Sequence, residues 1–400
     1  MNKEKFQTLK GFRDFLPENA LKREWLKEKI SATFKKWGYD PIETPTLEPL
    51  SLFENQIGED EKLFYKFQDQ GKRDVALRYD QTVPACRVAG QNPIPFKRYQ
   101  IQPVFRAEKP QKGRYREFLQ CDADIFGVNS PLADAEVIAL SLDIYKDLGF
   151  TNAKVLINDR NLLKGIPYKA LVSLDKINKI GKEAVLEELV KKGFGSKSKE
   201  YIEEVSNLKP NETIKTILNY LKSYGFNENQ FSFDPTIIRS FSYSTGPIWE
   251  VIIPNFEGGS VLGGERYNEL VKNICGKDIS GTGFGLGFDR TLESLEQFKL
   301  VPNIKTSTKV LVTVFSDNLF EKSLVTAKYL RDNLINTELY PYENNRLDKQ
   351  LKYADRKQIP YAIIIGPDEA EKEVITLKNL NTKEQKTATL KDIAAELSQR

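Results

Sequence analysis

Apolar residues recur at helical spacing in two long stretches of the chain, residues 19–37 and 130–149. In both stretches charged and polar side chains occupy the positions between the apolar ones. Asn19 and Ser130 stand at the starts of these stretches, and both residue types accept hydrogen bonds from the first N–H groups of a helix. The pattern therefore predicts two amphipathic helices with capped N-termini.

Shorter runs rich in β-branched and aromatic residues predict strands. Residues 95–108 and 115–127 flank a turn-forming segment with Pro110 and Gly113, which predicts an antiparallel hairpin. Residues 75–90 indicate a strand that turns into a helix. Further predicted strands, the last of which enters a helix, are 153–159, 239–254, 258–271 and 281–298.

The prediction divides the chain into four parts. A first part covers 1–159, and residues 160–232, rich in Lys and Glu at helical spacing, form a helical insertion. A third part, residues 233–304, continues the first part after the insertion. In 309–400 strands alternate with helices, which predicts a small mixed sheet covered by helices.

Composition narrows the possible chemistry. The chain has 400 residues, a formal net charge of +4 and no histidine, so imidazole bases and histidine-ligated metals are excluded. Its three cysteines are far apart and form no CxxC pair, which favours free thiols and a reducing cytoplasm. No apolar run approaches ~18 residues, so no membrane segment is predicted.

The predicted hairpin carries an unusual concentration of positive charge, in the segment "FRAEKPQKGRYREFLQ" from 105 to 120. Its cations are Arg106, Lys109, Lys112, Arg114 and Arg116. Alternation along the strands places Arg106 and Phe118 on a common face. A guanidinium beside an aromatic ring suits a nucleotide, whose phosphate and base need these two partners. A solvated hairpin with paired surface charges is the alternative interpretation.

The hairpin sequence resembles motif 2 of class II aminoacyl-tRNA synthetases, in the form found in the histidyl-tRNA synthetase family. The resemblance extends along nearly the whole chain. The supporting segments are "KGFRDFLP" (10–17), "ETPTLEPLSLF" (43–53, similar to motif 1), "LRYDQTVP" (77–84), "GFGLGFDR" (283–290, similar to motif 3) and "LDKQLKYADRKQIPYAIIIG" (347–366). It implies an α+β class II synthetase catalytic domain on an antiparallel sheet, with a helical insertion and a C-terminal α/β mixed-sheet anticodon-binding domain.

The resemblance implies that ATP and Mg²⁺ are used to activate L-histidine for transfer to tRNA(His), with no metal ligand set supplied by the protein. The catalytic residues implied are Arg106, Arg239 and Arg290. ATP contacts are implied for Arg106, Glu108, Arg114, Phe118 and Arg290. A core aromatic is the alternative role for Phe118.

The histidine-binding residues that the resemblance implies are Asp80, Gln81, Thr82, Arg106, Gln120, Asp124, Arg239, Tyr243 and Ser244. Within this set Asp80 and Thr82 match the residues that receive the α-amino group. Asp124 matches the acid that accepts a hydrogen bond from the imidazole ring, and an internal salt bridge is its alternative role.

Two segments depart from the family pattern around the amino-acid pocket. The family segment R-G-L-D-Y-Y-T-G reads "RSFSYSTG" from Arg239, so Ser242 and Ser244 are changed, and Ser244 stands where a tyrosine normally meets the imidazole. The segment G-G-G-R-Y-D reads "GGERYN", with Glu265 and Asn268 in place of glycine and aspartate. These changes leave open whether the chain selects histidine.

Two other functions therefore remain open. One is a histidine-sensing regulatory subunit of an ATP phosphoribosyltransferase, against which residues 309–400 argue, and the other is a synthetase relative for another amino acid. The resemblance also implies a homodimer through the segment around Pro45 and an anticodon-binding role for 309–400. The predicted helix 346–357 carries cations suited to RNA: Arg346, Lys349, Lys352, Arg356 and Lys357.

Overall fold

The computed structural model describes residues 7–56, 58–110, 115–239, 243–342 and 346–399. The chain forms two compact units. The first contains Leu26–Val301 and the N-terminal segment that ends at Asp14, and the second contains Phe15–Trp25 and the segment that begins at Pro302.

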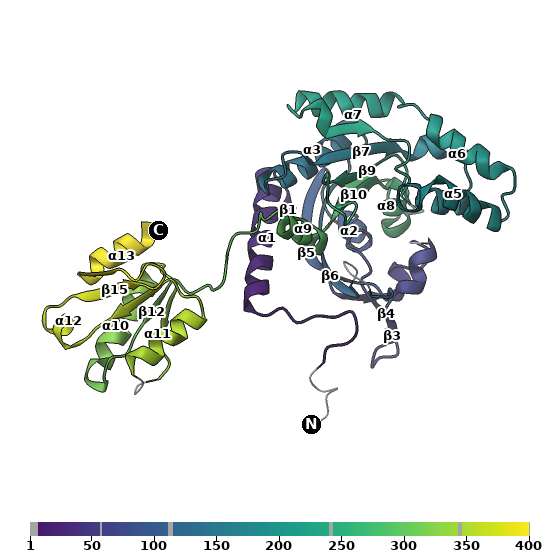
Figure 1. Ribbon diagram of the computed structural model, residues 1–400. Coiled ribbons are helices and arrows are strands. Elements are labelled where there is room, and N and C mark those ends of the chain that lie inside the picture. The colour runs from purple at the N-terminus through teal and green to yellow at the C-terminus, as the bar shows by residue number, and fades with distance from the viewer. Residues whose placement is uncertain (1–6, 57, 111–114, 240–242, 343–345, 400) are drawn as a thin grey trace. The chain divides into compact units, whose positions relative to one another are not determined.

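The first unit is built on an eight-stranded sheet, counted over the described residues (Figure 1). In sheet order its strands are β1 (Asp40–Pro41), β5 (Phe96–Phe105), β6 (Glu117–Phe126), β11 (Gly281–Gly287), β10 (Leu262–Arg266), β9 (Pro247–Ile252), β7 (Lys154–Asp159) and β8 (Phe231–Phe233). The inner strands pair antiparallel, and only the edge pairs β1/β5 and β7/β8 are parallel. The predicted antiparallel hairpin of 95–108 and 115–127 is confirmed as β5 and β6.

The two faces of this sheet differ because side chains alternate along each strand. On one face Arg266 and Thr282 reach Asp134 of α3 (Pro131–Asp147), at 2.9 and 2.7 Å. The predicted Ser130 cap of α3 is confirmed, since its side chain accepts a hydrogen bond from the backbone of Leu132. The opposite face carries the polar residues of β6 and forms the floor of the site described below.

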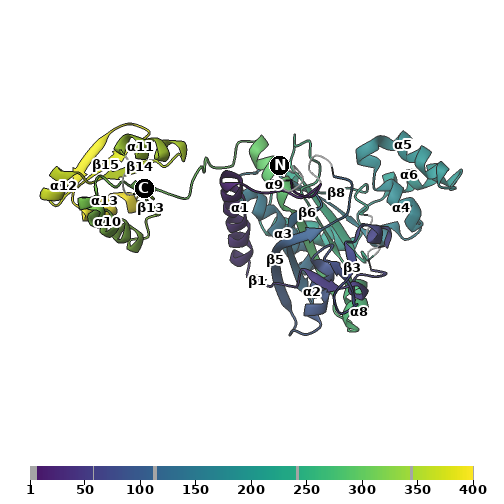
Figure 2. The ribbon, with the colours of Figure 1, turned by 90° about the horizontal axis from the view of Figure 1, so that it is seen from below.

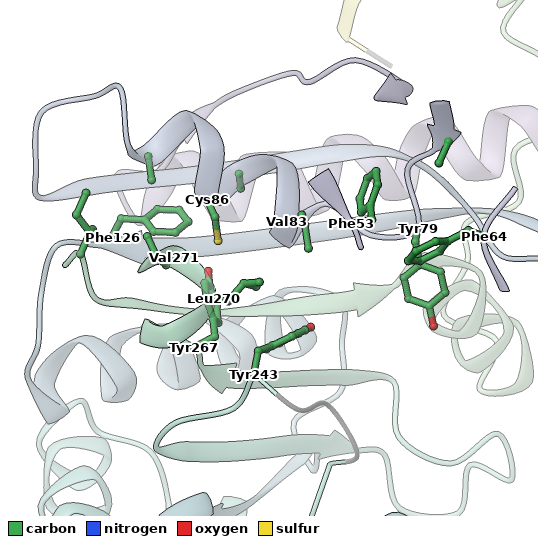
Figure 3. Close-up of a cluster of buried hydrophobic side chains, with 14 residues drawn as sticks. Phe53, Phe64, Tyr79, Val83, Cys86, Phe126, Tyr243, Tyr267, Leu270 and Val271 are labelled. Carbon is green, nitrogen blue, oxygen red and sulfur yellow. The ribbon is translucent and has the colours of Figure 1, made fainter. Parts of the chain in front are cut away.

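Helices α2 (Thr82–Ala89) and α8 (Asn268–Cys275) pack on each other over part of that opposite face. Figure 3 shows their shared core, in which Val83, Cys86, Phe126 and Leu270 are buried. The sequence prediction of a strand through 271 was wrong, because the chain leaves β10 at Arg266 and enters α8 at Asn268. Residues 239 and 243–246, predicted to be in a strand, lie outside β9, and residues 240–242 fall outside the described residues.

The remaining elements of the first unit surround the large sheet. Two further helices there are α1 (Pro17–Lys36), which lies partly in this unit, and α9 (Phe288–Gln297). A three-stranded antiparallel sheet has the order β2 (Leu47–Pro49), β4 (Asp74–Leu77), β3 (Lys66–Gln68).

Between β7 and β8 the chain forms four α-helices within the described residues, in the segment predicted to be a helical insertion. They are α4 (Tyr168–Leu174), α5 (Ile177–Lys191), α6 (Lys197–Asn207) and α7 (Glu212–Ser223). Helices α4, α5 and α6 pack together (Figure 2) around a hydrophobic core that also includes Ile248 of β9, whereas α7 packs on α3.

The second unit contains the mixed sheet predicted for the C-terminal segment. Its order is β13 (Thr337–Leu339), β12 (Val310–Val312), β14 (Tyr361–Ile364), β15 (Ile375–Asn379), β16 (Gln385–Ala388), with the first three strands parallel and the rest antiparallel. Its helices are α10 (Phe320–Asp332), α11 (Leu347–Arg356), α12 (Pro367–Glu371) and α13 (Leu390–Gln399). Helix α12 was not predicted, because its five residues are too few to show a helical period.

Candidate active site

Glycines form the floor of the site on the large sheet. Gly283 and Gly285 of β11 lie directly opposite Asp124 and Asp122 of β6 in the strand register. A Cβ on Gly283 would come within 1.9 Å of the Asp124 carboxylate, so only glycine leaves room for that side chain. The alternating glycines of β11 therefore open a hollow in which the polar side chains of neighbouring strands meet.

A cavity of about 340 Å³ lies over this floor. Most of the candidate residues line it together, although they come from distant segments: Asp80, Thr82, Arg106, Glu108, Phe118, Gln120, Asp124, Arg239, Tyr243 and Arg290. Arg114 and Ser242 lie outside the described residues. The cavity thus joins the hairpin, the β4–α2 connection, and strands β10 and β11 in one site.

Gln81 and Ser244 are both buried beside the cavity rather than among its lining residues. The Gln81 amide donates to the backbone carbonyls of Gln102 and Gln120, each at 2.8 Å, and so ties α2 to the β5–β6 hairpin. Gln81 therefore holds the hairpin backbone in position and does not itself line the cavity.

Arg106 is held between two aromatic rings at the base of the hairpin. Its guanidinium carbon lies 4.4 Å from the centre of the Tyr79 ring and 5.2 Å from that of Phe118. Its Nε donates to the Tyr79 carbonyl at 3.3 Å. These contacts fix the arginine while leaving it on the cavity wall. Phe118 is half-buried and lines the cavity.

A second arginine lines the cavity where β11 enters α9. Arg290 lies in the first turn of α9 and donates to the Ser260 carbonyl at 2.9 Å. Beside it, Asp289 pairs with Arg13 at 3.0 Å, and the Arg13 guanidinium lies 3.2 Å from the centre of the Tyr115 ring. The helix N-terminus and Arg290 together form a region of positive potential suited to phosphate.

Asp80 and Thr82 provide acidic and hydroxyl groups at the start of α2. The Val83 backbone donates to the Asp80 carboxylate at 3.1 Å. Burial raises the pKa of Asp80 from 3.8 to about 6, against the opposing effects of this hydrogen bond and of Arg106. A buried carboxylate of this kind gains most when a cation binds beside it.

Asp124 is both part of the cavity wall and part of a buried ion pair. It pairs with Arg98 of β5, and both side chains are almost fully buried. The Tyr267 hydroxyl donates a hydrogen bond to the same carboxylate. Burial raises the pKa of Asp124, while Arg98 and Tyr267 lower it. The internal salt bridge that was the alternative role for Asp124 is therefore present, and it does not remove the residue from the cavity.

Arg239 and Ser244 both contact Glu265, which departs from the family pattern as Ser244 does. Its guanidinium pairs with Glu265 of β10 at 3.2 Å, and the Ser244 hydroxyl donates to the other oxygen of the same carboxylate. A Cβ on Gly263 would lie 1.6 Å from the Arg239 guanidinium, so the arginine rests on the glycine backbone. Asn268 instead accepts a hydrogen bond from the Gly281 backbone and supports the start of α8.

Several lining residues were not predicted as site residues. They are Tyr115, Glu250, Ser260, Glu265, Tyr267 and Asp289. Glu250 lies opposite Gly263 in the register of β9 and β10, on the same face as Glu265. Alternation along a strand shows which of its own residues share a face. The pairing of β9 with β10 is needed to show that Glu250 and Glu265 both lie on the face that carries the site.

Comparisons with known proteins agree with this architecture. The family model described as histidyl-tRNA synthetase matches residues 11–196 and 169–291, and the anticodon binding domain model matches 309–400. A histidine--tRNA ligase from Cytophaga hutchinsonii is 38% identical over 446 residues, covering 97% of this chain and 98% of the relative.

Two solved structures resemble the fold. The histidyl-tRNA synthetase from Nostoc sp. has a TM-score of 0.83 and 27% identity, with 99% of each chain covered. A protein from Bacillus halodurans, described as an ATP phosphoribosyltransferase regulatory subunit/histidyl-tRNA synthetase, has a TM-score of 0.69. It covers 87% of this chain and 96% of its own at 23% identity, which shows the fold alone.

The antiparallel sheet with its glycine-floored cavity is the catalytic fold of a class II aminoacyl-tRNA synthetase, which confirms the fold class expected from the motifs. Within that class, the chain belongs to the histidyl-tRNA synthetase family.

Proposed function

We propose that the protein is a ligase that activates L-histidine with ATP and transfers the histidyl group to tRNA(His). One observation carries this proposal. Three arginines suited to phosphate, two groups suited to an ammonium and an acid suited to an imidazole line one cavity of about 340 Å³. That volume lies within the range typical of small-molecule sites.

Adenylate formation needs charge stabilisation more than an enzymic nucleophile. The substrate carboxylate itself attacks the α-phosphorus, and pyrophosphate leaves. Arg106, fixed by Tyr79 and Phe118, and Arg239, fixed by Glu265, would hold the α-phosphate and the substrate carboxylate. Because both guanidiniums are held before substrate binds, they offer positive charge where negative charge develops, with little reorganisation.

The two ends of ATP would meet different parts of the cavity. Phe118 would stack on adenine and Glu108 would lie near the adenine amino group. Arg290, at the N-terminus of α9, would hold the γ-phosphate, and Arg114, outside the described residues, is a further candidate for the distal phosphates.

The amino acid would lie over the glycine floor. Asp80 and Thr82 would receive its ammonium group, Gln120 and Tyr243 would line its path, and Asp124 would accept a hydrogen bond from the ring. Binding an ammonium favours ionised Asp80, so histidine affinity should fall as the pH drops below about 6.

Mg²⁺ fits this site as a companion of ATP. Among the described residues, no group of three or more acidic or cysteine side chains is arranged to hold a metal ion. Mg²⁺ usually keeps several waters and is held by one or two carboxylates together with substrate phosphates. Glu250, on the cavity wall near Arg239, is our candidate for that carboxylate. When bound, the ion would neutralise phosphate charge.

For tRNA we propose the second unit as the anticodon-binding part. On α11 the side chains of Lys349, Lys352 and Arg356 are exposed. Lys357, also predicted as an RNA contact, is instead paired with Glu338. Exposed cations on one helix suit a phosphate backbone.

We also propose a homodimer formed through the small three-stranded sheet. Leu47 and Phe67 are 41% and 49% exposed there. Strand alternation and register put Pro49 and Phe67 at either side of Val75, on the face opposite the buried Glu48. Exposed apolar side chains gathered on one sheet face favour burial against a partner. Light scattering should give twice the chain mass, and an active monomer would refute this assembly.

Histidine-dependent exchange of pyrophosphate into ATP tests the proposed activity, with each amino acid offered in turn. We expect exchange with histidine alone, followed by charging of tRNA(His). Exchange with another amino acid would point to altered selectivity, and histidine binding without any exchange would point to a regulatory subunit.

No helix within the described residues has the length and apolar character that a membrane span requires. We place the reaction in the cytoplasm, where its tRNA substrate is found.

A further inference from the structure

Two carboxylates face each other across the cavity floor. Asp124 of β6, Gly283 of β11 and Glu265 of β10 occupy one cross-strand row of the sheet. Neighbouring strands lie ~4.8 Å apart, so the Cα atoms of the two acidic residues are roughly 10 Å apart with only a glycine between them. Both side chains line the cavity and are buried, at 2% and 4% exposure.

Both carboxylates are hydrogen-bond acceptors on one row of the sheet, and both line the same cavity. An imidazole that donates from both nitrogens needs one such acceptor at each nitrogen. Asp124 leans over Gly283, as shown by the 1.9 Å separation between its carboxylate and a Cβ built there. The Asp124 carboxylate therefore lies over Gly283, on the side of Asp124 that faces Glu265.

Glu265 is oriented by two partners but has acceptor capacity left. One oxygen accepts from Arg239 at 3.2 Å, and the other accepts from the Ser244 hydroxyl. An ionised carboxylate offers about four lone-pair positions, so a further donor can be accepted. The two partners hold the carboxylate on the cavity wall.

The two residues concerned are linked departures from the family pattern. Where the pattern has a tyrosine and a glycine, this chain has Ser244 and Glu265, and the two contact each other. The smaller residue at 244 leaves space beside β10, and the larger residue at 265 brings a polar group to the same place. The tyrosine hydroxyl that meets the imidazole in the family pattern is thereby replaced by the Glu265 carboxylate.

We propose that Glu265 is a specificity-determining residue whose carboxylate accepts a hydrogen bond from the substrate ring nitrogen that faces away from Asp124. The pocket then selects histidine in the imidazolium form, because both ring nitrogens must donate. This inference rests on the proposed function, since it assigns the second ring contact of the same substrate.

The surrounding charges agree with this assignment. Among described residues, the charged and titratable groups facing Glu265 are Arg160, Arg239, Asp80 and Tyr243, and those facing Asp124 are Arg98, Asp122, Tyr39, Tyr267 and Cys86. Each carboxylate has an arginine beside it, and arginine does not titrate in proteins. With no histidine in the chain, the substrate ring is the group expected to lose charge just above pH 6.5.

The first experiment compares Glu265→Gln with the wild-type protein in histidine-dependent pyrophosphate exchange from pH 5.5 to 8.5. Wild-type kcat/KM for histidine should fall about tenfold per pH unit above ~6.5. In the variant it should be lower by at least about tenfold near pH 6.5 and no longer fall with pH, since an amide can also donate to a neutral ring. Glu269→Gln, an exposed change four residues away on α8, is the matched control.

The KM for ATP separates this role from a purely structural one. If Glu265 acted only by holding Arg239, the variant would change ATP and histidine parameters alike at every pH. We expect instead that only the pH dependence of kcat/KM for histidine is lost in the variant. An unchanged pH dependence in Glu265→Gln would overturn the proposal.

The second experiment needs no variant. Calorimetric titration of L-histidine into the wild-type protein at pH 8, in buffers of different ionisation enthalpy, measures protons taken up on binding. We expect net proton uptake, because free histidine has a neutral ring at that pH. Binding without uptake would refute imidazolium selection. Failure of wild-type exchange with histidine would refute the proposed function, whereas active exchange with a flat pH profile would refute only the role of Glu265.

Discussion

Replacing Asp80 with asparagine should stabilise the first unit at neutral pH while it impairs histidine binding. Burial raises the pKa of Asp80 in the folded protein from 3.8 to about 6. The raised pKa means that the folded state holds the proton more tightly than the unfolded state. The stability contributed by protonated Asp80 is therefore present below about pH 4 and lost as the pH rises through 6.

The magnitude follows from the size of the shift. A change of about two pKa units corresponds to ~3 kcal/mol between the protonation states, so ionised Asp80 reduces the free energy of unfolding by about that amount above pH 7. At pH 5 about half of this effect remains. Asparagine has no charge to bury, and its side-chain oxygen can still accept from the Val83 backbone.

Urea unfolding of both proteins from pH 5 to 8 measures this difference, with the fluorescence of the fully buried Trp249 as reporter. Other buried acids contribute equally to both proteins and cancel, and the chain has no histidine to titrate in this range. The stability advantage of Asp80→Asn should grow by roughly 1.5 kcal/mol over that range. Asp40→Asn, at an exposed position on β1, is the control. A constant difference would refute the claim that Asp80 is destabilised by burial, and unimpaired histidine binding would refute its contact with the ammonium group.

Three other changes test separate parts of the site. Arg239→Ala should slow pyrophosphate exchange by at least ~100-fold while circular dichroism stays unchanged, because a charge at the α-phosphate acts mainly on the transition state; an unchanged rate would make the arginine structural. Gly283→Ala should lower the unfolding free energy by about 1–3 kcal/mol and abolish histidine binding, because its Cβ would lie 1.9 Å from Asp124; Gly165→Ala, where the nearest atom is 3.4 Å away, should be tolerated in melting and exchange assays. Deleting 309–400 should spare exchange but impair tRNA charging, and equal loss of both, with the remaining fold intact, would contradict separate roles for the two parts.

The elements with strong local signals were predictable from sequence. The β5–β6 hairpin, the Ser130 cap of α3 and the β11–α9 turn all follow from periodicity and turn chemistry. The end of the strand in segment 258–271 was not predictable, because the apolar residues on both sides of Arg266 fit either a strand or a helix. Tertiary pairing decides such cases, since it determines where the strand ladder ends.

The site itself was only partly predictable. Arg106 and Arg290, chosen from the motifs, line the cavity, but Gln81 supports the hairpin from beside it. The pairing of Glu265 with Arg239 depends on the register of β9, β10 and β11. Sequence spacing contains no information on that register, because residues on adjacent strands can be separated by any length of chain.

The contact between Glu265 and Arg239 also leads us to expect that the binding of histidine and the binding of ATP depend on each other. One carboxylate borders the position proposed for the imidazole and holds the arginine proposed for the α-phosphate. When the imidazole donates a hydrogen bond to that carboxylate, the carboxylate should hold Arg239 less strongly, and Arg239 can then bind the α-phosphate of ATP better. Each ligand should therefore strengthen binding of the other. Linkage requires the two enhancement factors to be equal. Glu265→Gln should therefore reduce both factors by the same amount, which titration of each ligand in the presence and absence of the other would measure.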